Sequence, residues 1–286
     1  MNDIKIILKW AKDLFPICRS ITGDGLRYTL LYLKRVAPNL KILKFKSGQK
    51  CFDWTIPKEW NIDDAFLMHL KTKKKYAQFK KNNLHIMGYS QPKNIILDLN
   101  KFKNRIYHNK KYPKYIPYVT SYYKADWGFC MSYNEFKKLK KGKYKISINS
   151  QLKNGEMNSG DLLIKGKSKK EILFSTYVCH PSLANNELSG PLLGIYIAKK
   201  LSEIKRLKYS YRFLFVPETI GSIAYISKNL TRLKKNVIAG YVLSCVGDNN
   251  NYSFISSRLE NSLADQSLEA ALIKKKNVRK YSYLER

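Results

Sequence analysis

The sequence predicts an α/β fold in which a mostly parallel sheet carries helices on both faces. Three near-continuous apolar runs of strand length support this prediction, and helical segments alternate with them along the chain. The apolar runs are residues 171–179, 211–216 and 237–245. The helical segments are residues 189–205, 218–230 and 261–276. Strands that are apolar throughout are buried on both faces, which is typical of parallel sheets covered by crossover helices.

Two further helices are predicted in the N-terminal segment. Apolar residues repeat at helical spacing from Leu26 to Ala37, and Pro38 ends this helix. After it the sequence changes to short alternating pieces separated by Gly, Pro, Asn and Lys, which is typical of a β-rich subdomain with long loops. The predicted division is N-terminal helices of the core at 1–41, a β-rich subdomain at 42–150 and the main α/β core at 151–286.

The charge of the chain is strongly positive. The formal net charge is +33, from 54 Lys+Arg against 21 Asp+Glu. Such a charge is compatible with an anionic partner such as nucleic acid, and the aromatic-rich segment 112–133 would suit base stacking. However, the densest basic runs lie far apart in the sequence, at 71–81, 137–145 and 165–170. This scatter favours solvated faces and a general compositional bias over a nucleic-acid interface.

The cysteines and the N-terminus indicate a cytoplasmic protein. The five cysteines form no CxxC pair, and Cys179 and Cys245 end apolar runs, so we expect reduced core thiols. The N-terminal segment lacks the features of a signal peptide, and no apolar run is long enough to span a membrane.

Ionisable side chains follow the predicted strands at the points where each strand ends. His180 follows the first strand, Glu218 the second and Asp248 the third, while Asn186 and Glu187 lie on the loop after His180. Ligands of open α/β sheets bind beyond the carboxyl ends of the strands. Imidazole and carboxylate groups bind Zn²⁺, and a nearby glutamate can take a proton from a bound water molecule. The pattern therefore indicates a divalent metal site.

Each of these residues also has a purely structural interpretation. His180 is compatible with a loop or core histidine, Glu218 with a carboxylate in the first turn of a helix, and Asp248 with a turn former. Their common position at one sheet edge is what favours the functional interpretation.

Several long segments resemble a known family. They are RSITGDG, FDWTIPKEW, IPYVTSYYKADWGFC, STYVCHPSLANNELSGP, YRFLFVPETIGSIAYIS and GYVLSCVGD. Together they resemble the aminopeptidase-like family found near bacterial polysaccharide-biosynthesis genes, which is related to the zinc aminopeptidases of the leucyl-aminopeptidase and glutamate-carboxypeptidase type.

This resemblance implies a phosphorylase/hydrolase-like core with one or two Zn²⁺ ions and an inserted β-rich subdomain that matches residues 42–150. It also implies His180 and Asp248 as metal ligands and Glu218 as the general base. At the position of an expected metal-bridging aspartate the chain has Asn186, followed by Glu187, and we expect these two residues to form an altered bridge.

The resemblance also implies a C-terminal truncation, because KYSYLER at 280–286 matches the lead-in to a further family segment. The expected function is a zinc-dependent, aminopeptidase-like hydrolase that cleaves a peptide or a related amide in a sugar-linked substrate. The alternative is a catalytically degenerate or truncated family member that acts as a binding protein.

Overall fold

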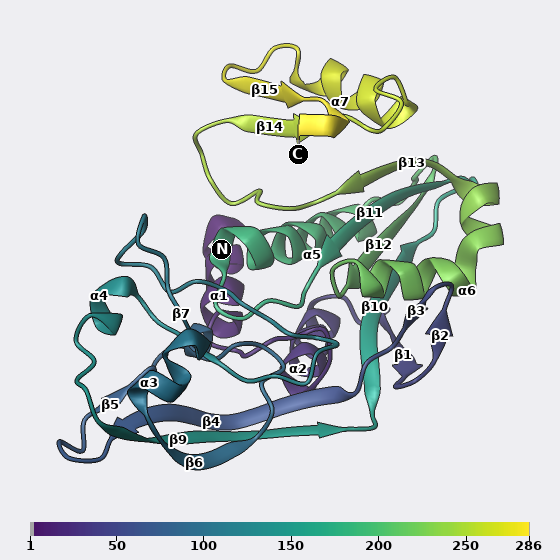
Figure 1. Cartoon of the computed structure of the whole chain (residues 1–286). Coiled ribbons are helices and arrows are strands. Elements are labelled where there is room, and N and C mark those ends of the chain that lie inside the picture. The colour runs from purple at the N-terminus through teal and green to yellow at the C-terminus, as the bar shows by residue number, and fades with distance from the viewer. Residues whose placement is uncertain (1–2, 286) are drawn as a thin grey trace.

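The computed structural model describes residues 3–285. Its centre is a five-stranded sheet in the order β1-β10-β12-β11-β13 (Figure 1). The strands are β1 (Lys41–Lys46), β10 (Glu156–Ile164), β11 (Glu171–Tyr177), β12 (Ser210–Val216) and β13 (Val237–Val242). β12, β11 and β13 run parallel, whereas β10 pairs antiparallel with both β12 and β1. The predicted α/β class is confirmed, and the sheet is mixed: β1, β11, β12 and β13 run in one direction, and β10 runs opposite to them.

Helices cover both faces of this sheet, as the sequence predicts. The helices are α1 (Asp3–Leu14), α2 (Asp24–Val36), α5 (Ser189–Ser202) and α6 (Ile220–Asn236). Successive side chains of a strand point to opposite faces. Phe213 and Phe215 of β12 therefore pack in one core with apolar residues of α1, α2 and α5, whereas Leu214 and Val216 pack with Tyr225 of α6.

A second, antiparallel sheet of four strands lies beside the large sheet (Figure 1). Its order is β5-β4-β9-β6, with β4 (Glu59–His69), β5 (Lys75–Tyr76), β6 (Lys93–Asp98) and β9 (Lys143–Lys153). The same part of the chain also holds β2 (Lys50–Cys51), β3 (Trp54–Thr55), β7 (Ile106–Tyr107), β8 (Phe129–Cys130), α3 (Leu99–Phe102) and α4 (Tyr133–Phe136). The segment 42–150 therefore takes in most of this smaller sheet, together with β1 of the large sheet. The division into domains stays a prediction.

The C-terminal part forms a small unit next to β13 (Figure 1). It comprises β14 (Tyr252–Ile255), α7 (Leu263–Leu272) and β15 (Val278–Tyr281). α7 begins with a capping box, in which Ser262 and Asp265 satisfy each other's backbone N–H groups. Over residues 3–285, no helix is both long and apolar enough to cross a membrane.

The apolar run at 237–245 is only partly a strand. β13 ends at Val242, and Cys245 has a φ of 52°. This positive φ takes the chain out of the extended conformation. All five cysteines are free thiols, but Cys245 is exposed, so the prediction that it is a core thiol is wrong.

Candidate metal centre

The three parallel strands bring their carboxyl ends to one edge of the large sheet. β11 lies between β12 and β13, so the loops that follow all three strands are neighbours. These loops carry His180 after β11, Glu218 after β12 and Asp248 after β13. The structure therefore has the shared edge that the sequence predicts, and the question is which side chains meet there.

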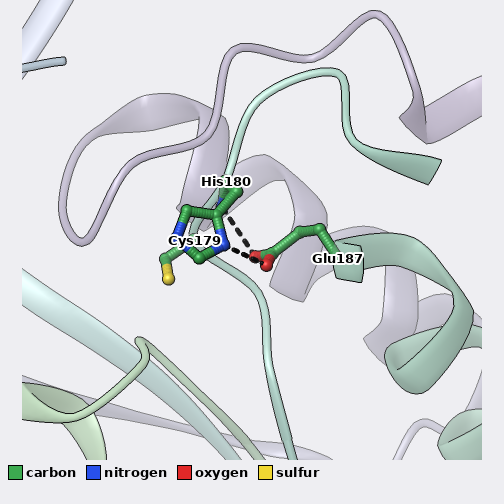
Figure 2. Close-up of side chains that lie close together, drawn as sticks. All are labelled: Cys179, His180 and Glu187. Atoms are coloured by element: carbon green, nitrogen blue, oxygen red, sulfur yellow. Dashed lines mark hydrogen bonds and ion pairs between the residues drawn. The ribbon is translucent and has the colours of Figure 1, made fainter. Parts of the chain in front are cut away.

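His180 is buried, and Glu187 holds it at two atoms (Figure 2). Oε1 of Glu187 accepts a hydrogen bond from the backbone N–H of His180 at 2.6 Å, and Oε2 lies 2.6 Å from Nδ1. A carboxylate only accepts hydrogen bonds, so Nδ1 carries a proton and is the donor to Glu187, and Nε2 is the ring nitrogen that remains for another partner. Both oxygens of Glu187 are used in this way, and its side chain is completely buried.

Glu187 reaches His180 because of the local backbone. Residues Ala184–Leu188 form a π-helical turn that leads into α5. The turn buries Glu187 and leaves the adjacent Asn186 exposed. π-Helical turns are rare and occur frequently at functional sites.

The other ring nitrogen of His180 faces Glu218. Nε2 lies 3.4 Å from Oε2 of Glu218, whose side chain is 51% exposed. Two ligands that are each about 2.1 Å from a tetrahedral zinc ion lie about 3.4 Å from each other. An ion held by Nε2 would therefore lie close to the carboxylate of Glu218.

The residue after Glu218 has a strained backbone. Thr219 has φ 59° and ψ −76°, and the N–H of Ile220 donates to the carbonyl of Glu218 at 2.7 Å. This is a γ-turn with positive φ, which is costly for a β-branched residue. Ser182 after β11 and Cys245 after β13 also have positive φ, so each of the three loops at this edge contains a strained residue. Such strain clusters at functional sites.

Cys179 lies beneath the same edge. Its Sγ accepts a hydrogen bond from the backbone N–H of Glu218 at 3.2 Å. Complete burial raises the pKa of this thiol well above its ordinary value. Cys179, His180 and Glu187 form the group of His, Cys, Asp and Glu side chains in residues 3–285 that lie close enough together to hold a metal ion. The hydrogen bond that the thiol accepts indicates that it supports the backbone of Glu218.

Asn186 and Asp248 are oriented differently from the other predicted site residues. Nδ2 of Asn186 lies 3.4 Å from the hydroxyl oxygen of Tyr177. Asp248 is exposed, and its carboxylate accepts a hydrogen bond from the N–H of Asn250 at 3.0 Å, as in an Asx turn. Within the part of the chain that the structure describes, Asp248 is not a member of the group around His180. The ligand roles predicted for these two residues stay predictions.

Two tyrosines that the sequence analysis did not identify flank the imidazole. The ring of Tyr118 stands edge-on to His180 with a centroid distance of 4.7 Å, and Tyr177 lies at 5.8 Å. The hydroxyl oxygens of Tyr118 and Tyr122 are 2.8 Å apart. Burial raises the pKa of both phenols, which are therefore neutral. The aromatic-rich segment 112–133 was the available signal for Tyr118, but its sequence does not show that it reaches the edge of the large sheet.

Comparison with known proteins decides the family. The family model described as "Domain of unknown function (DUF4910)" matches residues 8–286. The chain belongs to this family. It is 45% identical over 267 residues to a Clostridium acetobutylicum protein that carries the provisional name of a polysaccharide biosynthesis protein with an aminopeptidase-like domain. That match covers 93% of the chain and 61% of the relative, so the chain spans about three fifths of the relative's length.

Solved structures confirm the fold of this family member. A crystal structure of a C. acetobutylicum protein, provisionally described as a peptidase, has a TM-score of 0.94 at 42% identity, with 98% of this chain and 65% of that chain covered. A zinc aminopeptidase from Bacillus subtilis has a TM-score of 0.66 at 12% identity, covering 97% of this chain and 78% of that chain. The resemblance predicted from the motifs is confirmed, and the chain has a peptidase-like α/β fold.

Proposed function

We propose that this chain carries a zinc-dependent, aminopeptidase-like hydrolase site at the carboxyl edge of β11, β12 and β13. The observation that supports this most strongly is the orientation of His180. Its Nδ1 is bound to the buried Glu187, and its Nε2 lies 3.4 Å from Glu218. A histidine that ligates a metal usually donates its other ring N–H to a carboxylate or carbonyl, and Glu187 meets this requirement.

Each residue has a distinct role in this proposal. His180 would hold the ion through Nε2, and Glu187 would fix the tautomer and the ring plane. Glu218 is exposed and close to Nε2, so it is suited to accept a proton from a water molecule that attacks an amide. A zinc ion bound at Nε2 supplies Lewis acidity and lowers the pKa of a water molecule towards about 7.

One ion suits the residues better than two. The side chain of Asn186 offers an amide where a bridge between two ions needs an anion, and both oxygens of Glu187 are occupied by His180. We therefore propose a single ion at His180, and the ligand roles of Asn186 and Asp248 stay predictions. The substrate class that we propose is a small peptide or an amide-containing sugar, which fits the naming of the relative in polysaccharide biosynthesis.

The test is zinc binding by matched histidine variants. His180→Ala should abolish high-affinity binding, measured by competition with a chromophoric chelator. His69→Ala is the control, because His69 is also buried but bonds Thr72 in the smaller sheet. Equal zinc affinity of His180→Ala and the wild type would refute the site. Peptide hydrolysis by the wild type, lost on removal of the metal, would support the enzymatic assignment.

The second candidate is a binding protein without catalysis. The neutral amide of Asn186 and the exposed position of Asp248 favour it, because each leaves the site with one anionic ligand fewer. Under this alternative the wild type binds zinc but hydrolyses no peptide, and Asn186→Asp strengthens zinc binding.

A further inference from the structure

Arg19, in the segment RSITGDG, lies beneath the proposed metal centre although it is 161 residues from His180 in sequence. Its side chain is 1% exposed and is among the largest that the fold buries almost completely. Nε donates to the backbone carbonyl of His180 at 3.1 Å, and Nη1 donates to the carbonyl of Leu14 at 2.6 Å. A buried guanidinium is costly unless an opposite charge and hydrogen bonds compensate it, so its position here needs an explanation.

The loop that carries Arg19 is fixed by its two glycines. A Cβ on Gly25 would lie 1.8 Å from the carbonyl oxygen of Cys18, and Gly23 has a φ of 94°. The hydroxyl of Thr22 accepts a hydrogen bond from the N–H of Trp60 at 3.0 Å, which ties the loop to β4. The segment therefore closes on itself and against the smaller sheet, and this geometry holds Arg19 in place.

Arg19 and Glu187 both hold His180, and they carry opposite charges. Burial lowers the pKa of the guanidinium, and the negative charge of Glu187 opposes that shift. The two side chains bind opposite groups of the same residue. Arg19 binds the carbonyl of His180, while Glu187 binds its N–H and its ring. His180 is thus held between a buried cation and a buried anion.

We propose that Arg19 is a positioning residue of the metal centre, which fixes the backbone of His180 opposite Glu187 so that Nε2 points to the ion. This inference rests on the proposed zinc site. Nη2 of Arg19 is buried without a hydrogen-bond partner in the described chain. A cavity of about 10 Å³ lined by Arg19, Tyr118 and Pro181 lies beside it, with room for one water molecule.

The experiment compares the zinc affinity of three variants, each measured at a temperature at which circular dichroism shows it to be folded. Arg19→Met removes the charge and the hydrogen bonds, and we expect roughly 10- to 100-fold weaker binding, as for other partners of metal ligands. Arg19→Lys keeps the charge and should recover part of the loss. Arg212→Met is the control, because Arg212 is also buried but lies in an ion network at the other end of the sheet. We expect its zinc affinity to stay within about twofold of the wild type, as for a residue that touches no metal ligand.

Two outcomes would overturn the role of Arg19. One is a zinc affinity of Arg19→Met within twofold of the wild type, and the other is an equal loss in Arg212→Met. If Arg19→Met does not fold, Arg19→Lys carries the test, and an unchanged affinity overturns the proposal.

A separate measurement covers the case in which the wild type binds no zinc, which would refute the proposed function. The shifts in Tm caused by Arg19→Met and Glu187→Gln are then compared singly and together. Because the two groups hold the same residue, His180, we expect a double variant less destabilised than the sum of the single ones. Additive shifts would show that Arg19 and Glu187 do not act together on His180.

Discussion

At the amino end of β11 and β12, a buried guanidinium contacts two carboxylates. At the carboxyl end of the same strands, a buried imidazole faces a single carboxylate that is half exposed. Arg212 donates to Glu171 at 2.6 and 3.1 Å and to Asp161 at 2.5 Å. The hydroxyl of Tyr225 donates to the second oxygen of Asp161. At the other end, Nε2 of His180 and the exposed carboxylate of Glu218 lie 3.4 Å apart.

The difference between the two ends separates a structural role from a functional one. Buried charges that satisfy each other inside the fold leave no position for a ligand. Removing one of them destabilises the fold. A buried ring nitrogen beside a solvent-exposed carboxylate can take up an ion from solution. The amino end should therefore control folding, and the carboxyl end should control metal binding and catalysis.

The largest effect is expected from breaking the satisfied network. Arg212→Met leaves Asp161 without its cation and leaves the buried Glu171 with Arg232 alone, at 3.6 Å, and we expect the free energy of unfolding to fall by roughly 3–5 kcal/mol. Chemical denaturation measures this loss. A loss below about 1 kcal/mol would show that the network is not a structural element.

At the open end, Glu218→Gln should act on catalysis alone. Its side chain is 51% exposed, so little stability depends on its charge. If Glu218 accepts the proton from the attacking water, kcat should fall by roughly 10²- to 10⁴-fold while zinc stays bound. Loss of zinc together with activity would instead identify Glu218 as a metal ligand.

Thr219→Gly tests the role of the strained turn that follows Glu218. Glycine adopts positive φ without a steric cost, so we expect a gain in stability of about 1 kcal/mol. The same change should lower kcat several-fold, because the backbone next to Glu218 becomes more flexible. A loss of stability would show that the threonine side chain makes a contact worth more than the strain.

The last effect depends on pH and concerns a second satisfied pair, between α2 and β4. Hydrogen bonds from Arg27 lower the pKa of Glu59 to about 2. The folded-state pKa is below the ordinary value of 4.5, so the pair stabilises the fold above that pH, and this contribution is lost as the pH falls towards 2. Glu59→Gln should therefore destabilise the protein at pH 7 and have a smaller effect near pH 2. An equal effect at both pH values, measured by urea denaturation, would contradict this assignment.

The sequence predicts where β11 and β12 end better than it predicts which side chains of the following loops point inwards. The strands β11 and β12, and the convergence of His180 and Glu218, follow from apolar runs and from the direction of parallel strands. The role of Glu187 does not follow from the sequence, because only the π-helical turn shows that Glu187 points inwards and Asn186 outwards.

Contacts between distant segments were also hard to predict. Tyr118 reaches His180 from the loop between β7 and β8, and Arg19 reaches it from the N-terminal segment. No periodic pattern in the sequence predicts either contact. In contrast, the turn-forming interpretation of Asp248 agrees with its hydrogen bond to Asn250, which is a local interaction.

The most direct test of the account is the protonation state of the two His180 ring nitrogens, measured by ¹⁵N NMR during a zinc titration. The chain has four histidines, so the signals can be assigned with single variants. We predict that Nδ1 stays protonated throughout because Glu187 accepts its hydrogen bond, and that zinc shifts the Nε2 resonance alone. A shift at Nδ1, or saturating zinc that leaves both His180 nitrogens unchanged, would contradict the proposed metal centre.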